Sequence, residues 1–178
     1  NKIEDNNHVK LGAAGTTVSV VPAGVGVLVL ANDVTEIRDN SFTGNKSAAV
    51  LAISYSTFET ICAATGGENC TSTDPKTDRD MSKLYVHDNT FKDNGLDPDE
   101  TVASLFKAPI ENVLWDGRKP ADAVDEDQLC LGPNGTSVRM FGDQKGFNAM
   151  RSQDVTDPKK FTCTLPAPFS EIKLPQAT

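Results

Sequence analysis

Residues 26–55, with the sequence GVLVLANDVTEIRDNSFTGNKSAAVLAISY, decide the predicted fold. Short apolar runs alternate with turn residues in this stretch, and this pattern predicts three strands separated by turns. An Asp-Asn-x-Phe motif follows a β-like run at Asp39–Phe42 and again at Asp88–Phe91, and a degraded copy, Asp5–His8, opens the chain. Self-similarity of this kind predicts stacked structural repeats.

Aligning the three copies predicts columns of like side chains. These are an aliphatic column (Ile3, Ile37, Val86), an asparagine column at the bend (Asn6, Asn40, Asn89), an aromatic column (Phe42 and Phe91, with His8) and a shorter asparagine column (Asn45, Asn94). A carboxamide both donates and accepts hydrogen bonds, so stacked asparagines can satisfy the backbone of a bend and one another. The alternative is that they are unrelated turn residues, because asparagine is common in turns.

The predicted fold class is all-β: a right-handed parallel β-helix, or solenoid, over residues 1–115. Residues 10–25 and 56–82 are expected to be inserted loops, and residues 116–178 an irregular C-terminal cap in the same domain. A solenoid needs caps because an open terminal coil exposes unpaired strand edges. The N-terminal end shows no comparable cap, which predicts either further coils upstream or another chain covering that end. We therefore expect the chain to be the C-terminal part of a longer protein.

The four cysteines predict two disulfides. They lack the paired spacing of a zinc site, and we expect Cys62 to bond Cys70 and Cys130 to bond Cys163, the latter pair holding the cap. Loop-closure entropy assigns these bonds roughly 2.5 and 3.7 kcal/mol. Disulfides place a protein outside the cytoplasm, in the periplasm or secreted; four free thiols in a cytosolic protein are the alternative.

Composition excludes two classes of partner. The formal net charge of −8 argues against nucleic acid, which is bound through Lys and Arg. No apolar run approaches the roughly 20 residues that cross a bilayer, so no membrane span is expected. The acidic residues are dispersed along the sequence, which is typical of a solubilising surface.

The Asp-Asn-x-Phe motif and its preceding strand resemble the right-handed parallel β-helix repeats of the pectate-lyase-like superfamily. The C-terminal part is similar to secreted bacterial repeat proteins without a settled activity, in Trp115–Gly117, Cys130 and Cys163–Pro166. The resemblance implies a β-helix but only weakly an activity, since the superfamily includes lyases, hydrolases, epimerases, adhesins and plain scaffolds.

In the enzymes that this chain resembles, the site lies on outward-facing residues of one strand face. The predicted register gives two such columns: Glu4–Arg38–His87 and Lys2–Glu36–Tyr85. Chemistry on a uronate needs a cation for the carboxylate, a base and an acid. Arg38 is the candidate cation, and His87 or Tyr85 the proton-transfer groups. The alternative is a solvated, weakly paired charged face.

No cofactor is predicted, although the acidic turns at Asp97–Glu100 and Asp122–Asp127 could hold Ca²⁺. Neither turn has the spacing of a recognised calcium loop, and plain surface turns are the alternative.

Together these observations predict an extracytoplasmic β-helix scaffold or binding module that presents a surface to carbohydrate or to a protein partner. The alternative is a polysaccharide lyase or epimerase acting on uronate polymers. A third hypothesis is that the chain is a subunit whose N-terminal end binds a partner by strand addition.

Overall fold

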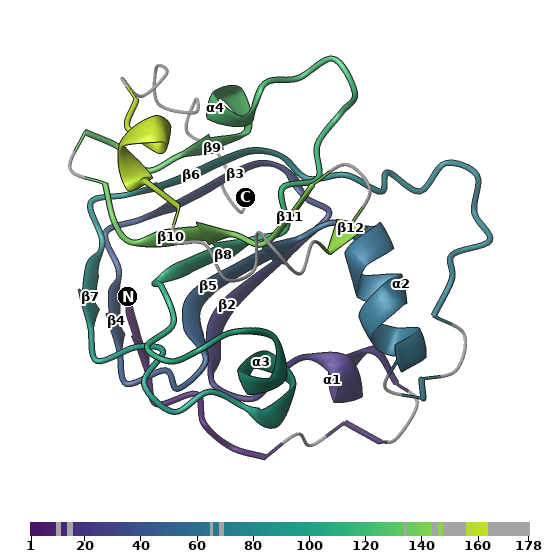
Figure 1. Ribbon diagram of the computed structural model, residues 1–178, viewed down its shortest axis with the longest axis horizontal. Coiled ribbons are helices and arrows are strands. Elements are labelled where there is room, and N and C mark those ends of the chain that lie inside the picture. Colours follow the sequence, from purple (N-terminus) through teal and green to yellow (C-terminus); the bar gives the residue numbers. More distant parts are fainter. Residues whose placement is uncertain are drawn as a thin grey trace, which may run out of the picture.

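The computed structural model describes residues 1–9, 12–13, 16–64, 66–67, 70–133, 135–143, 146–147 and 156–163. Most of its strands belong to three short parallel sheets (Figure 1). The first contains β1 (Lys2–Glu4), β4 (Ser41–Thr43) and β7 (Thr90–Lys92). The second has the order β2 (Val25–Leu30), β5 (Ala48–Ile53), β8 (Val113–Trp115) and β10 (Val138–Met140). The third contains β3 (Asp33–Arg38), β6 (Ser82–His87) and β9 (Leu129–Cys130).

Helices and one antiparallel pair complete the described elements. The helices are α1 (Thr17–Val20), α2 (Tyr55–Ala64), α3 (Glu100–Leu105), α4 (Asp125–Gln128) and the 3-10 helix η2 (Pro158–Phe161). The antiparallel pair is β11 (Gly142–Asp143) with β12 (Gly146–Phe147).

The predicted fold class, an all-β right-handed parallel β-helix with an irregular cap, is wrong. In the described part of the chain the strands form three separate short sheets with helices between them, and no closed solenoid. Part of the difference lies in the expected loops, because residues 17–20 and 55–64 fold into α1 and α2. The expected cap also differs, since β9 and β10 pair in parallel with β6 and β8. Residues 164–178 of that cap lie outside the described residues.

The four-stranded sheet is the centre of the core because both of its faces are covered. Figure 1 shows α1, α2 and α3 on one side of this sheet and β3 and β6 on the other. All six residues of β5 are buried, and alternate side chains of the strand point to opposite faces. Val50 belongs to the same buried cluster as Trp115, whereas Leu51 belongs to a second cluster with Phe58 of α2.

The expected aliphatic and aromatic columns are right for the second and third repeats and wrong for the first. Ile37 pairs with Val86, and the rings of Phe42 and Phe91 stack with centroids 5.3 Å apart. Ile3, however, pairs with Phe42 and not with Ile37. His8 is exposed, and the Phe42 column continues through Ile3.

Two asparagine columns run through the fold, five residues apart in each repeat. In the first, Asn1 donates from Nδ2 to Asn40 Oδ1, and Asn40 donates to Asn89 Oδ1 at 3.1 Å. The predicted Asn40–Asn89 contact is thus confirmed. The predicted place of Asn6 in this column is wrong.

Asn6 belongs to the second column instead. It donates from Nδ2 to Asn45 Oδ1 at 3.0 Å, and Asn45 donates to Asn94 Oδ1 at 2.9 Å. The predicted Asn45–Asn94 column is therefore confirmed and one residue longer than expected.

Both predicted disulfides are present. Cys62 bonds Cys70 and Cys130 bonds Cys163, with Cα atoms 5.7 Å apart in each pair. The first ties the end of α2 to the loop that follows it, and the second ties β9 to the segment after η2. Two disulfides fit a protein that works outside the cytoplasm.

Candidate functional site

His87, one of the predicted catalytic residues, lies at the end of β6 between two carboxylates. Its Nδ1 is 2.7 Å from Asp88 Oδ2, and its Nε2 is 3.0 Å from Glu36 Oε1. The side chain is only 6% exposed. Asp88 can turn back to the ring because its backbone is left-handed, with φ of 52°.

These neighbours determine the charge of the imidazole. Burial by itself would lower the pKa of His87, but the hydrogen bonds to Asp88 and Glu36 and their negative charges outweigh it, so the pKa is raised. His87 is thus favoured as an imidazolium with both nitrogens donating to carboxylates. Such a group holds β3 to β6, and it would need to lose a partner before it could accept a proton from a substrate.

Arg38 and Tyr85 lie beside this cluster. Arg38 is directly opposite His87 in the register, and Tyr85 is opposite Glu36. The Arg38 side chain is 56% exposed and lies 3.6 Å from Glu36 and 3.2 Å from Asp39. The structure thus brings the three predicted catalytic residues onto neighbouring strands, and their catalytic role stays a prediction.

The expected outer columns extend over two strands and not over three. Lys2 and Glu4 were predicted to continue them, but β1 pairs with β4 and places Lys2 opposite Ser41 and Glu4 opposite Thr43. That part of the prediction is wrong. As for Ile3, the predicted alignment shifts the first repeat by five residues relative to the second.

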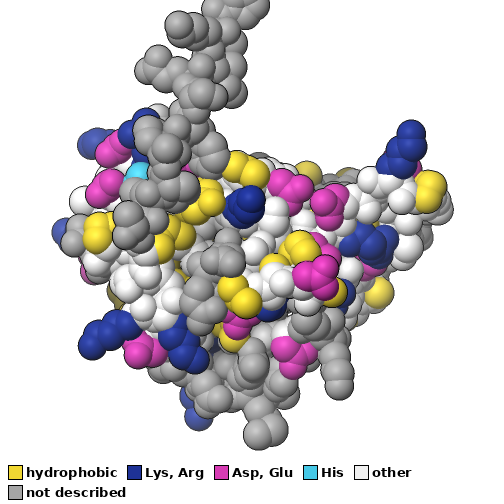
Figure 2. Space-filling model, turned by 90° about the horizontal axis from the view of Figure 1, so that it is seen from above, with side chains coloured by type: hydrophobic (Ala, Val, Ile, Leu, Met, Phe, Trp, Pro, Cys, Tyr) yellow, Lys and Arg dark blue, Asp and Glu magenta, His cyan; other side chains and the backbone are white. Residues whose placement is uncertain are grey.

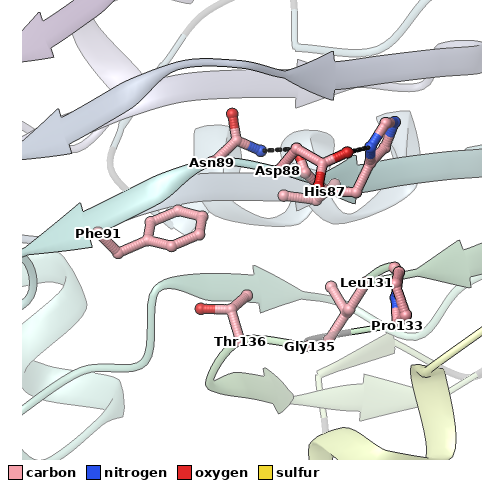
Figure 3. A pocket seen from close by; sticks show the side chains of 10 residues that line it. His87, Asp88, Asn89, Phe91, Leu131, Pro133, Gly135 and Thr136 are labelled. Atoms are coloured by element: carbon pink, nitrogen blue, oxygen red, sulfur yellow. Dashed lines mark hydrogen bonds and ion pairs between the residues drawn. The ribbon is translucent and has the colours of Figure 1, made fainter.

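A small pocket of about 60 Å³ adjoins His87. Figure 3 shows His87, Asp88, Asn89 and Phe91 along one side; the opposite side is formed by Leu131, Gly132, Pro133, Gly135 and Thr136. Ligand pockets usually enclose at least about 300 Å³, so this one is too small to surround a sugar ring. An enzyme was expected to have a groove walled by residues 10–25 or 56–82, and neither segment lines the pocket.

The acidic turns considered for Ca²⁺ have other partners. Asp97 pairs with Lys46 at 3.2 Å, and Asp99 caps α3 by accepting from Thr101 N. Asp125 pairs with Lys119 at 3.2 Å, and the side chains of residues 126 and 127 lie outside the described ones. The part of the chain that the structure describes contains no cluster of three His, Cys, Asp or Glu side chains placed to hold a metal.

Among the described residues, the face seen from above has no single-sign patch. Figure 2 shows acidic and basic side chains interspersed over it. This mixed surface agrees with the alternative of a solvated charged face and gives no broad electrostatic footprint for a polyanion or polycation.

A second candidate site was only partly visible in the sequence: the outer edges of the first strands. β1, β2 and β3 each end their sheets, and no described residue pairs with the outer edge of any of them. At the opposite ends, β9 and β10 contact the 156–163 segment, where Leu131 N donates to Phe161 O and Met140 N to Thr156 Oγ1. Within the described residues the outer edges of β9 and β10 therefore have partners, whereas those of β1, β2 and β3 have none; β7, at the far end of the first sheet, has no strand on its outer edge either.

No known protein family, no characterised protein and no solved structure matches this chain. The resemblance to the pectate-lyase-like superfamily therefore stays a prediction. Among the described helices, none is long and apolar enough to span a bilayer.

Proposed function

We propose that the chain is an extracytoplasmic binding module that recognises an extended polypeptide along the free edges of β1 and β2. One observation carries this proposal: the first strand of each parallel sheet has an unpaired outer edge in the described structure. Strand addition to such an edge is a common mode of peptide recognition, because main-chain hydrogen bonds supply affinity and alternate side chains supply specificity. The two disulfides support the extracytoplasmic location.

The backbone groups that would bind the partner follow from the existing ladders. Ala31 N donates to Ile53 O, so Ala31 faces β5, and by alternation Val27 and Val29 do too. The N–H and C=O groups of Leu28 and Leu30 then point to the open edge.

The same alternation applies to β1. Asp5 N donates to Thr43 O, and Asn1 O accepts from Ser41 N, so the odd-numbered residues face β4. Lys2 and Glu4 consequently direct their backbone groups outward.

The composition of β2 supports a covered edge in the functional state. Natural edge strands are protected by Lys, Pro, bulges or inward charges, and the sequence VGVLVL has none of these. Five of its six residues are only half-buried, whereas every residue of the neighbouring β5 is buried. An added strand would bury this apolar surface and satisfy the outward backbone groups.

The uronate lyase or epimerase is the second candidate, supported by the placement of Arg38 opposite His87. The small pocket and the two engaged imidazole nitrogens make it the weaker proposal. Incubating the chain with polygalacturonate and with alginate tests it directly, with Arg38→Ala and His87→Ala as controls. Turnover that either substitution abolishes would favour the enzyme over the binding module.

Selection of binders tests the edge. Short random peptides displayed on phage are selected against the wild-type chain and counter-selected against Glu4→Pro. Proline removes an outward N–H that donates to no described residue, and the exposed Glu4 side chain makes Glu4→Ala a matched control. We expect selected peptides to bind wild type and Glu4→Ala alike and to lose binding to Glu4→Pro. Peptides that bind all three equally would contradict the proposal.

A further inference from the structure

Three of the four asparagine contacts between successive repeats follow one hydrogen-bonding rule; the exception is Asn1 with Asn40, because Asn1 N donates to Asp39 O. The asparagine of the earlier repeat donates from both its backbone N and its Nδ2 to Oδ1 of the next asparagine. This holds for Asn6 with Asn45, for Asn45 with Asn94 and for Asn40 with Asn89. The donor–acceptor distances are 2.9–3.1 Å except for Asn6 N, at 3.4 Å.

The rule has a return bond. The later asparagine donates from Nδ2 to the carbonyl of the residue three positions before the earlier asparagine. Asn45 thus donates to Ile3 O, Asn94 to Phe42 O and Asn89 to Ile37 O, at 2.7–3.0 Å. Asn45, Asn89 and Asn94 therefore each bond both the asparagine and the strand of the repeat before them.

The same geometry defines a four-residue unit. Its first residue is apolar and lies in or beside the core, its third has a left-handed backbone, and its fourth is the asparagine. The five copies are Ile3–Asn6, Ile37–Asn40, Phe42–Asn45, Val86–Asn89 and Phe91–Asn94. The third residues, Asp5, Asp39, Gly44, Asp88 and Asp93, have φ between 50° and 67°. Asp and Gly are among the residues that adopt this conformation most readily.

At the open end this pattern stops at Asn6. Its Oδ1 accepts no hydrogen bond from any described residue, although Asn45 and Asn94 each accept two at that atom. Asn6 is exposed, and its Nδ2 donates to Asn45 alone among the described residues. The return bond to a preceding strand is thus also missing there.

We infer that the open edge recognises a segment of a separate polypeptide with the sequence apolar–any–Asp/Gly–Asn at the end of a strand. This rests on the proposed function and specifies its partner. The asparagine of the partner donates from N and Nδ2 to Asn6 Oδ1, and Asn6 Nδ2 donates to the carbonyl three residues earlier in the partner. The strand of the partner lies parallel to β1, and its apolar residue stacks on Ile3, which continues the Phe42–Phe91 column.

A synthetic peptide of residues 37–47, IRDNSFTGNKS, is the probe, because it carries two copies of the unit and the strand between them. The control peptide carries Asn40→Asp and Asn45→Asp, since a carboxylate has the same shape but cannot donate. Binding is measured by fluorescence anisotropy in about 1 M salt, where the Debye length is about 3 Å and the added charges are screened. We expect the control peptide to bind about ten-fold more weakly than the probe.

Variants of the chain test the same contact from the other side. Asn6→Ala is expected to weaken binding of the probe about ten-fold. Asn32→Ala is the matched control, because Asn32 is also exposed and its side chain makes none of the described hydrogen bonds; it should bind as wild type does.

The outcomes separate this inference from the proposed function. If the probe and the control peptide bind equally, recognition of asparagine is wrong, while the proposed binding along the strand edge stands. The same conclusion follows if the probe binds Asn6→Ala as well as it binds wild type. If neither peptide binds but peptides selected by display do, again only the inference falls. Self-association of the chain that Glu4→Pro abolishes would assign the edge to a second copy and overturn the inference of a separate partner.

Discussion

Replacing Asn45 by alanine should destabilise the fold by about 3 kcal/mol. The side chain is fully buried and makes three short hydrogen bonds: it accepts from Asn6 Nδ2 at 3.0 Å and donates to Ile3 O and Asn94 Oδ1 at 2.9 Å. A net value of about 1 kcal/mol for each bond gives the sum. Asn6→Ala is the matched comparison, because Asn6 is exposed and its side chain makes only the bond to Asn45; it should cost about 1 kcal/mol or less.

Urea unfolding followed by the fluorescence of Trp115, the single tryptophan, measures both free energies. The dependence of the unfolding free energy on urea concentration should be the same in both variants, so that the shift in the unfolding midpoint reports the change in stability alone. Equal losses for Asn45→Ala and Asn6→Ala would refute the reasoning, because they would show that the buried ladder contributes no more than an exposed turn.

Three further predictions concern groups away from the ladder. The pKa of His87 is raised in the folded state, so the stabilisation by His87 should be present below about pH 6.5 and be lost as the pH rises through the raised pKa. In a pH series of unfolding free energies, His87→Gln should lack this loss. Parallel pH curves for wild type and His87→Gln would contradict the prediction. Glu111→Ala removes the carboxylate that lies 2.6 Å from the buried Arg139 and should lower the free energy of unfolding in urea by about 3–5 kcal/mol. The double variant Glu111→Leu/Arg139→Met should recover most of that free energy. An equal loss in the double variant would argue against the pairing. Replacing Cys130 and Cys163 by serine should cost about 3–4 kcal/mol by the same measurement, and an unchanged midpoint would show that this disulfide does not constrain the unfolded chain.

The second and third repeats could be aligned from the sequence because both carry the same pattern with the same spacing. Ile37 and Val86, Asn40 and Asn89, and Phe42 and Phe91 are each 49 positions apart, and the structure pairs them. The 49-residue interval includes α2 and the loop after it without disturbing the register. The local strand-and-turn pattern therefore predicts pairing across a long insertion.

The first repeat was misaligned because its single Asp-Asn pair fits either of two turns. Ile3–Asn6 matches the apolar–any–Asp–Asn unit before β4 and the equivalent unit after it. The five-residue spacing from Asn1 to Asn6 is the signal that decides, because Asn40 and Asn45 have the same spacing. Aligning the repeats on the Asp-Asn-x-Phe motif does not use this spacing, and it places His8 opposite the phenylalanines.

The helices and the site were less visible in the sequence. Residues 55–64 contain polar and β-branched residues, and their helix is favoured by burial of Phe58 and Cys62, four residues apart, and by the disulfide to Cys70. The position of Arg38 opposite His87 followed from the register. The two carboxylates around His87 did not, since Glu36 reaches it diagonally across the strand pair and Asp88 depends on a left-handed backbone.

Amide hydrogen exchange along β2 tests the open edge most directly. The N–H groups of Leu28 and Leu30 should exchange about 100-fold faster than those of Val27 and Val29, because by the alternation only the valines donate to β5. Uniform protection from Val27 to Leu30 in the chain alone would show that the outer edge is already covered, and it would contradict the proposed binding mode.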